Sequence, residues 1–301
     1  MKLELGAQLP AWQWDFHIDE LRDWAQGAEA LGYEWLGMPD HIFYAYETPT
    51  REVGSYAGGT IQHEAFTFLS WLAALTERVH LTTSVIVLPQ RQAPIVAKQA
   101  AEIDIVSRGR FRLGIGIGWQ EAEFDGLGKN FHDRGRRTEE DIAVLRACWG
   151  KEPLEFVTSA ERVDQLSMIP KPFTPGGPPI LYGGTSDRGI DRTARLCDGW
   201  IAQTRFKAEG AGELVERMHT ALARYGKDPA TFPLQATVAA SEDFDDLAKT
   251  FGAFLDAGFS RLGLHLPGIH DVEAEPQRQS VDAHLDLLRR IREEVWAPLA
   301  G

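Results

Sequence analysis

The sequence contains few cysteines and no long hydrophobic segment. Its 301 residues include only Cys148 and Cys197, which form no metal-ligand or redox spacing, so both are expected to be reduced core residues. No stretch approaches the roughly 18 apolar residues that a membrane-spanning helix requires. The first residues, MKLELGAQLP, lack the long apolar run of a signal peptide. We therefore expect a cytoplasmic protein that does not associate with a membrane.

Positive charge is also scarce in this chain. It has 31 Lys and Arg against 44 Asp and Glu, a net charge of −13, whereas proteins that bind nucleic acid usually carry clustered cations. The single basic run, 134–137, is followed at once by acidic residues, a pattern typical of a salt-bridged helix start. The charge balance therefore predicts no nucleic-acid partner.

Several well-known catalytic motifs are absent. The histidines show no H-E-x-x-H spacing and have no cysteine pairs nearby, so no metal site is expected. There is no G-x-S-x-G segment and no P-loop. These absences argue against metallohydrolase, serine-hydrolase and nucleotide-hydrolysing chemistry.

Short apolar strand patterns alternate with helical patterns along the whole chain. The strand patterns lie at 3–9, 33–38, 79–88, 111–118, 178–184, 198–203, 233–239 and 259–266. Strands that alternate with helices form a parallel sheet, and eight such pairs predict a closed barrel. We therefore predict one α/β domain over residues 1–301, a (β/α)₈ TIM barrel. A proline-containing stretch at about 151–178 breaks the alternation and is interpreted as a short insertion.

A doubly wound sheet is the alternative fold. It would require a G-x-G-x-x-G turn after the first strand, but residues 6–10 read GAQLP. The barrel interpretation is therefore preferred.

The second predicted strand ends in Pro39, Asp40 and His41. In TIM barrels, function collects on the loops that follow the C-terminal ends of the strands. A histidine can exchange a proton near neutral pH, so His41, with Asp40 beside it, is a candidate general acid or base. The alternative is a histidine at the barrel rim that is only hydrogen-bonded.

The fourth predicted strand, FRLGIGIG, places Gly114, Gly116 and Gly118 on one face. Glycine weakens a strand and marks a bend or the close approach of a ligand or another backbone. We interpret Gly116 and Gly118 as positions of close ligand approach, followed by Trp119 as an aromatic wall of the pocket. Close helix packing outside the barrel is the alternative.

A glycine-containing loop precedes the helix predicted at 187–197. Gly183, Gly184, Thr185 and Ser186 lie where backbone N–H groups and a helix dipole can bind a phosphate. The alternative is a turn capped by serine with no ligand.

Aromatic residues occur on two loops that follow predicted strands. Trp12 and Trp14 follow the first strand, and Tyr44 and Tyr46 follow the second. Gathered on one rim, they would form an apolar cleft for a small-molecule substrate. Ordinary loop packing is the alternative.

Three segments together resemble the luciferase-like monooxygenase superfamily, specifically its coenzyme F420-dependent oxidoreductase branch. They are residues 82–128, which contain QRQAPIVAKQAAEIDIVSRGRFRLGIGIGWQEAEFDGLG, residues 134–149 and residues 178–200. The resemblance covers nearly the whole chain and implies a TIM barrel with a flavin-type cofactor at the C-terminal rim of its strands.

The resemblance also implies roles for individual residues. Thr83, Ser84 and Val85 match the position where the family places a non-proline cis peptide behind the central cofactor ring. The Asp40–His41 pair matches the family's, with the histidine near the reactive carbon as acid or base. The loop 183–186 matches the one that holds the cofactor phosphate. Some members carry an acidic residue directly after the glycine strand as a proton donor, where this chain has Trp119.

The cofactor implied is coenzyme F420, a deazaflavin that passes a hydride and does not activate oxygen. FMN is the alternative, although FMN-dependent luciferases carry a doubled His or a Cys where this chain has Asp40 and His41. The expected activity is hydride transfer between coenzyme F420 and an organic substrate. The first alternative is an FMN-dependent monooxygenase supplied by a separate flavin reductase, and the second is a non-catalytic flavin-binding barrel. Relatives are commonly dimers, which implies a homodimer.

Overall fold

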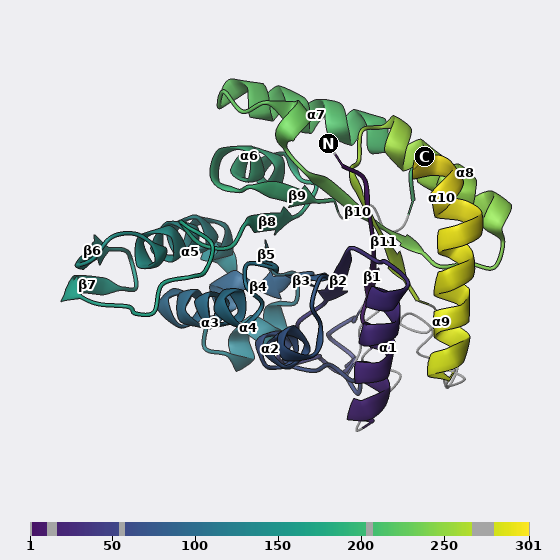
Figure 1. Cartoon of the computed structure of the whole chain (residues 1–301). Helices are drawn as coiled ribbons and strands as arrows, with labels where there is room; N and C mark the ends of the chain where they lie inside the picture. Colours follow the sequence, from purple (N-terminus) through teal and green to yellow (C-terminus); the bar gives the residue numbers. More distant parts are fainter. Residues whose placement is uncertain (1, 11–16, 54–57, 203–206, 267–279, 301) are drawn as a thin grey trace.

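The computed structural model describes residues 2–10, 17–53, 58–202, 207–266 and 280–300. These residues form a closed barrel of eight parallel strand positions with helices between them, as predicted (Figure 1). We call each position a stave; β3 and β4 together form the third stave. The strand order is β3-β2-β1-β11-β10-β9-β8-β5-β4, and an additional pairing of β3 with β5 closes the ring.

The barrel strands match the predicted strand patterns to within a few residues. They are β1 (Glu4–Gln8), β2 (Trp35–Met38), β3 (His80–Thr83), β4 (Ile86–Val87), β5 (Phe111–Gly116), β8 (Ile180–Gly183), β9 (Gly199–Ile201), β10 (Leu234–Ala239) and β11 (Arg261–His265). The main helices are α1 (Ile18–Ala30), α2 (Ala65–Leu75), α3 (Ala93–Val106), α5 (Arg134–Trp149), α6 (Asp187–Leu196), α7 (Ala211–Arg224), α8 (Phe244–Asp256) and α9 (Val281–Arg290).

Strand β5 shows why the sequence folds in this way. Phe111, Leu113 and Ile115 are fully buried in the hydrophobic core. The intervening Gly114 and Gly116 carry no side chain, so the opposite face of the strand leaves space for other groups. The two-residue period therefore fixes which face of β5 packs outward.

Charged and aromatic side chains fill the barrel interior near the N-terminal ends of the strands. Arg112 Nη1 lies 2.6 Å from Glu4 Oε2, and Arg261 Nε lies 3.2 Å from the same oxygen. Next to them the indole of Trp35 occupies space that a Cβ on Gly6 or Gly263 would enter. This packing closes one end of the barrel and leaves the C-terminal ends of the strands as the place for a ligand.

The third stave is interrupted, which the pattern at 79–88 did not predict. Strand β3 ends at Thr83, strand β4 begins at Ile86, and the peptide bond between Ser84 and Val85 is cis. The cis bond lies where the family resemblance implies it. A strand pattern alone cannot show such an interruption, because both halves stay buried.

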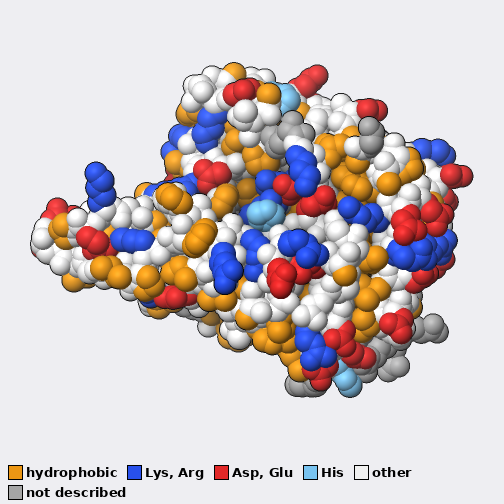
Figure 2. All heavy atoms as spheres, in the orientation of Figure 1, with side chains coloured by type: hydrophobic (Ala, Val, Ile, Leu, Met, Phe, Trp, Pro, Cys, Tyr) orange, Lys and Arg blue, Asp and Glu red, His pale blue; other side chains and the backbone are white. Residues whose placement is uncertain are grey.

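The predicted insertion is an antiparallel hairpin of β6 (Leu154–Val157) and β7 (Arg162–Leu166). Figure 1 shows it projecting from the barrel beside α5, and Figure 2 shows hydrophobic side chains along the projection. Val157 and Leu166 are among its exposed hydrophobic residues.

Two details of the helices differ from the sequence prediction. A six-residue helix, α4 (Glu121–Gly126), follows the glycine strand, and the predicted helix 279–296 changes to a π-helix at Ile291–Trp296 before α10 (Ala297–Ala300). Cys148 and Cys197 are both buried free thiols. Among the described residues, no helix has both the length and the apolar character needed to cross a membrane.

Candidate active site

His41 lies just after the C-terminal end of β2, and its closest charged partner comes from α4. His41 Nδ1 lies 2.9 Å from Glu123 Oε2, although the two residues are 82 positions apart in the sequence. Two aromatic rings flank the imidazole: that of Tyr44 has its centroid 4.9 Å away, and that of Trp119 has its centroid 6.0 Å away in an edge-on arrangement. The imidazole of His41 therefore has a carboxylate partner and two aromatic rings beside it.

Glu123 is 1% exposed and is held by several hydrogen bonds. Its Oε1 accepts from the backbone N–H of Ile42 at 2.7 Å and of Phe43 at 3.2 Å. Its Oε2 also accepts from Gln90 Nε2 at 3.0 Å. Burial raises the pKa of Glu123, but the hydrogen bonds with His41, Gln90 and the backbone outweigh this and leave the pKa lowered. The residue is therefore an ionised buried carboxylate.

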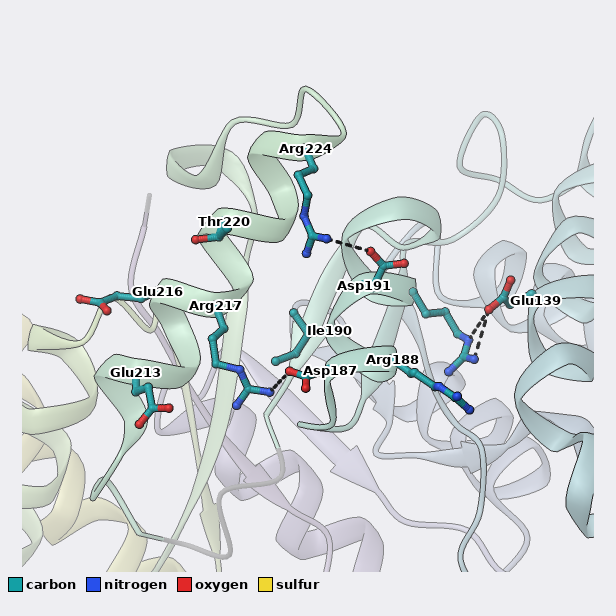
Figure 3. Close-up of a pocket in the computed structure, with 11 residues that line it drawn as sticks. Glu139, Asp187, Arg188, Ile190, Asp191, Glu213, Glu216, Arg217, Thr220 and Arg224 are labelled. Carbon is teal, nitrogen blue, oxygen red and sulfur yellow. Dashed lines mark hydrogen bonds and ion pairs between the residues drawn. The ribbon is translucent and has the colours of Figure 1, made fainter.

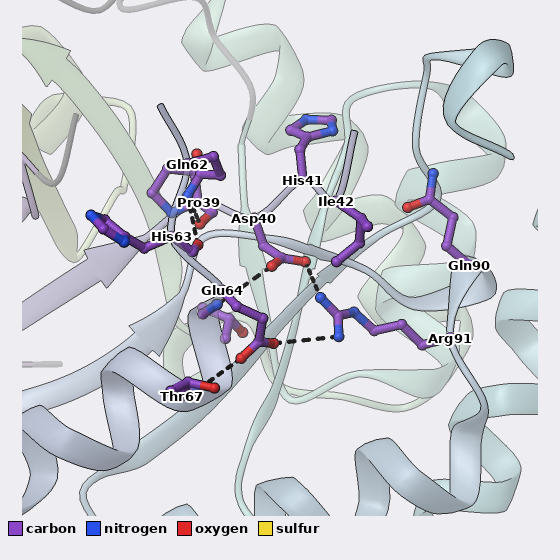
Figure 4. Close-up of polar contacts among 12 residues, drawn as sticks. Pro39, Asp40, His41, Ile42, Gln62, His63, Glu64, Thr67, Gln90 and Arg91 are labelled. Atoms are coloured by element: carbon purple, nitrogen blue, oxygen red, sulfur yellow. Dashed lines mark hydrogen bonds and ion pairs between the residues drawn. The ribbon is translucent and has the colours of Figure 1, made fainter. Parts of the chain in front are cut away.

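Asp40 has different partners from its neighbour His41. Arg91 Nη2 lies 2.7 Å from Asp40 Oδ2, and Arg91 also lies 3.4 Å from Glu64. In Figure 4 the imidazole of His41 points away from this group. Burial raises the pKa of Asp40, and Arg91 opposes that rise. The contacts of Asp40 therefore connect the start of α2 to the segment before α3. The predicted catalytic role of Asp40 stays a prediction.

The glycines of β5 and β8 make room for the interrupted third stave. A Cβ on Gly114 would lie 1.8 Å from the carbonyl oxygen of Thr83. A Cβ on Gly116 would lie 2.8 Å from Val85 Cγ2, and one on Gly183 would lie 3.2 Å from Val85 Cγ1. The close approach that the glycine pattern indicated is therefore made, among the described residues, by the chain itself. Ligand approach at Gly116 stays a prediction.

Gly118 forms a turn at the end of the glycine strand. Its φ of +77° lies in the region that favours glycine, and a Cβ there would lie 2.6 Å from Val87 and 2.8 Å from Phe124. The turn leads into Trp119, whose side chain is 49% exposed. Trp119 therefore lies at the surface beside His41, and its role as a pocket wall stays a prediction.

The loop 183–186 combines an unusual backbone with a capped helix. Gly184 has a φ of +149°, and its carbonyl oxygen accepts a hydrogen bond from Trp200 Nε1 at 2.7 Å. Ser186 Oγ accepts from the backbone N–H of Gly189 and caps α6. The guanidinium of Arg217 donates to the carbonyl oxygen of Thr185. The loop is thus a fixed backbone turn at a helix N-terminus, the geometry that suits an anion.

A surface groove of about 680 Å³ lies between α6 and α7 (Figure 3). Arg217 and Asp187 form an ion pair of 2.6 Å across it, and Arg224 lies 3.7 Å from Asp191. Neither His41 nor Glu123 lines this groove. It is therefore separate from the group of residues around His41.

Of the four aromatic residues predicted on the loops after the first two strands, the structure describes Tyr44 and Tyr46. Tyr44 contacts His41, and its hydroxyl lies 3.2 Å from Gln62 Oε1. Tyr46 is 68% exposed. Trp12 and Trp14 lie outside the described residues.

Three residues around Asp40 and His41 were missed by the sequence analysis, namely Glu123, Gln90 and Arg91, and Gln8, described below, was missed as well. Gln90 and Arg91 lie at the end of the third stave, where the barrel rule alone could have directed attention to them. Glu123 is one of three acidic residues in EAEFD (121–125). Nothing in that short run distinguishes the buried carboxylate from the exposed ones.

A buried polar atom at the barrel rim fits a polar cofactor ring. Gln8, at the C-terminal end of β1, donates from Nε2 to Ser84 Oγ at 3.0 Å. Its Oε1 is buried and has no hydrogen-bond partner among the described residues. Buried acceptors are usually paired, so an N–H on the edge of a flavin-type ring suits this position.

The family model described as luciferase-like monooxygenase matches residues 3–295. The FMNH₂-dependent dimethylsulfone monooxygenase of Pseudomonas fluorescens (strain Pf0-1) is 36% identical over 199 residues, 65% of this chain and 50% of that protein. Pyrimidine monooxygenase RutA of Variovorax paradoxus (strain S110) is 31% identical over 208 residues, 65% of this chain and 53% of that protein. The aligned region thus spans about half the length of these curated relatives.

A solved F420-dependent secondary alcohol dehydrogenase, in complex with an F420–acetone adduct, superposes with a TM-score of 0.79. The identity is 16%, and the match covers 99% of each chain. At this identity the likeness concerns the fold, which is the same closed barrel.

Proposed function

This chain belongs to the luciferase-like monooxygenase family, and from that premise we propose that it transfers a hydride between coenzyme F420 and a small organic substrate. Enzymes of this family act with a flavin-type cofactor. The protein would bind and orient the ring and the substrate, and would move the proton that accompanies the hydride.

The His41–Glu123 pair carries this proposal. A two-electron oxidation of an organic substrate releases a hydride and a proton, and the imidazole of His41 would take that proton. In the reverse direction it would supply the proton. The short contact to a buried carboxylate and the flanking rings of Tyr44 and Trp119 support such a role.

The residues proposed to hold the cofactor are grouped at the C-terminal rim of the barrel. Thr83, Ser84 and Val85 would support the central ring, with Gln8 Oε1 as an acceptor for its polar edge. The loop 183–186 would bind the phosphate through backbone N–H groups. Gly116, Gly118 and Trp119 would border the same pocket. When bound, coenzyme F420 supplies the hydride chemistry.

An FMN-dependent monooxygenase is the second candidate function. The relative that is 36% identical is named as FMNH₂-dependent, and RutA is also named as a monooxygenase. In that case the chain would receive reduced flavin from a separate reductase. A non-catalytic flavin-binding barrel is disfavoured by the ionised Glu123 beside His41, because a binder has no need of such a pair.

Cofactor titration separates these candidates. Purified protein is titrated with coenzyme F420 and with FMN, each in its oxidised and its reduced form, and binding is followed by absorbance and fluorescence. We expect micromolar or tighter binding of coenzyme F420, and FMN affinity at least about tenfold weaker, or about 1.4 kcal/mol. Tight FMNH₂ binding without coenzyme F420 binding would replace the first candidate with the second. Binding of either cofactor without any turnover across a panel of alcohols, carbonyls and alkenes would favour the non-catalytic barrel.

A further inference from the structure

We propose that Glu123 is the positioning residue that fixes the tautomer of His41, keeping the proton on Nδ1 and the basic lone pair on Nε2. This inference rests on the proposed role of His41 in proton transfer. It gives a task to a residue for which the family resemblance implied no role. Glu123 lies four residues beyond Trp119, the position where some relatives carry an acidic proton donor.

The hydrogen bonds of the Glu123 carboxylate determine which nitrogen of His41 carries the proton. An ionised carboxylate only accepts hydrogen bonds, so every partner must be a donor. Oε1 faces two backbone N–H groups, those of Ile42 and Phe43, and Oε2 faces the amide nitrogen of Gln90. His41 Nδ1, 2.9 Å from Oε2, must therefore carry a proton.

The carboxylate cannot easily turn away from this arrangement. Glu123 is 1% exposed, and its two oxygens are held from the 41–43 segment on one side and from Gln90 on the other. Its pKa is lowered, so it remains ionised at neutral pH. In the neutral imidazole, Nε2 is then the basic nitrogen, the one that faces away from the carboxylate.

Glu123→Gln tests this with little change in shape. The two backbone N–H groups retain the amide oxygen as their acceptor, which places the amide NH₂ toward His41 Nδ1. A donor then faces Nδ1, so the imidazole proton should move to Nε2. The variant reverses the tautomer, whereas a purely structural role for Glu123 predicts no such reversal.

Glu121→Gln is the matched control. Glu121 lies on the same helix, and its exposed carboxylate contacts His132 at 3.4 Å. This variant removes the same charge from the same helix and should leave the tautomer of His41 unchanged.

The tautomer is read by nitrogen-15 NMR of the histidine side chains without any cofactor. The signals of His41 are assigned by their loss in His41→Asn. We expect the Nδ1–H form in the wild type and in Glu121→Gln, and the Nε2–H form in Glu123→Gln. An Nε2–H tautomer in the wild type would overturn the inference even if the Glu123 variant failed to fold.

Kinetics distinguish this inference from the proposed function. Once turnover is established, Glu123→Gln should lower kcat by about 10²–10⁴-fold with little change in KM, the range for a lost general acid or base. A reversed tautomer in a protein that binds no coenzyme F420 would retain the inference and refute the proposed function. Full turnover and an unchanged tautomer in Glu123→Gln would refute the inference alone.

Discussion

Arg91 Nη2 lies 2.7 Å from Asp40 Oδ2, so Asp40 and its neighbour His41 are held by partners from different parts of the barrel. Asp40 is tied to the segment before α3, and His41 is tied to α4 through Glu123. The Asp-His pair that stands out in the sequence is therefore divided between an anchoring contact and a contact at the candidate active site.

Arg91→Met should destabilise the protein, because Asp40 is 2% exposed and would lose its cation. Breaking a buried ion pair in this way costs about 3 kcal/mol in the free energy of unfolding, measured by urea denaturation. The loss should be larger at pH 8, where Asp40 is ionised and its buried charge needs the cation. It should be smaller at pH 4, because burial raises the pKa of Asp40 and so favours the uncharged carboxyl at low pH. Arg22→Met, which breaks an exposed contact to Asp19, is the control and should cost clearly less. Equal losses would contradict the buried-pair interpretation.

Gly114→Ala should disturb the interrupted third stave. The new Cβ would lie 1.8 Å from the carbonyl oxygen of Thr83, so backbone must move. We expect a loss of about 2 kcal/mol or more in the free energy of unfolding. Gly252→Ala in α8 meets nothing within 4 Å and should instead stabilise the protein by up to about 1 kcal/mol. A stable Gly114→Ala protein would mean that the two staves are not in contact here.

Gly184→Ala should weaken cofactor binding. The φ of +149° at Gly184 is one that alanine rarely adopts, so the loop must change conformation where the phosphate is expected to bind. We expect at least about a tenfold loss of affinity, or about 1.4 kcal/mol. Gly176→Ala, at a φ of +83° in open space within the insertion, is the control: it also places alanine at a positive φ, but away from the site. Affinity that falls equally in both variants would remove this loop from the site.

His41→Asn should lower turnover by about 10²–10⁴-fold, the usual effect of losing a general acid or base. Asparagine keeps much of the size and one hydrogen bond but does not titrate. Cofactor affinity should change little, because the loop 183–186 and the segment 83–85 remain. The pH profile of the rate should differ between the wild type and the variant, because only the histidine can exchange the proton. Normal turnover with an unchanged pH profile would show that His41 only lines the pocket.

Asp141→Asn should change how stability depends on pH. Burial raises the pKa of Asp141 to about 7, with Arg137, 2.7 Å away, opposing the rise. The neutral form is favoured in the folded state, so the wild type loses stability as pH rises from about 4 to about 7. Relative to the wild type, the variant should therefore gain up to roughly 4 kcal/mol across that window. The exposed Asp125→Asn should show no such trend, and parallel stability curves for all three proteins would disprove the prediction.

Much of the fold could be predicted because its causes are local. The two-residue alternation in β5, the helical spacing of α3 and the break at the insertion depend on residues that are neighbours in the sequence. The interruption after Thr83 was predicted only through the family resemblance, since the strand pattern continues through Ser84 and Val85 without a change in period.

The sequence by itself determined the barrel and the rim on which function is expected, because periodicity specifies each strand and helix and the βα order specifies how they close. Only the tertiary structure decided the partners at that rim. His41 meets Glu123 across 82 positions, Asp40 meets Arg91 across 51, and Gly116 of β5 meets Val85, which precedes the neighbouring strand β4. These pairings have no sequence period, since they depend on which strand ends become neighbours when the sheet closes.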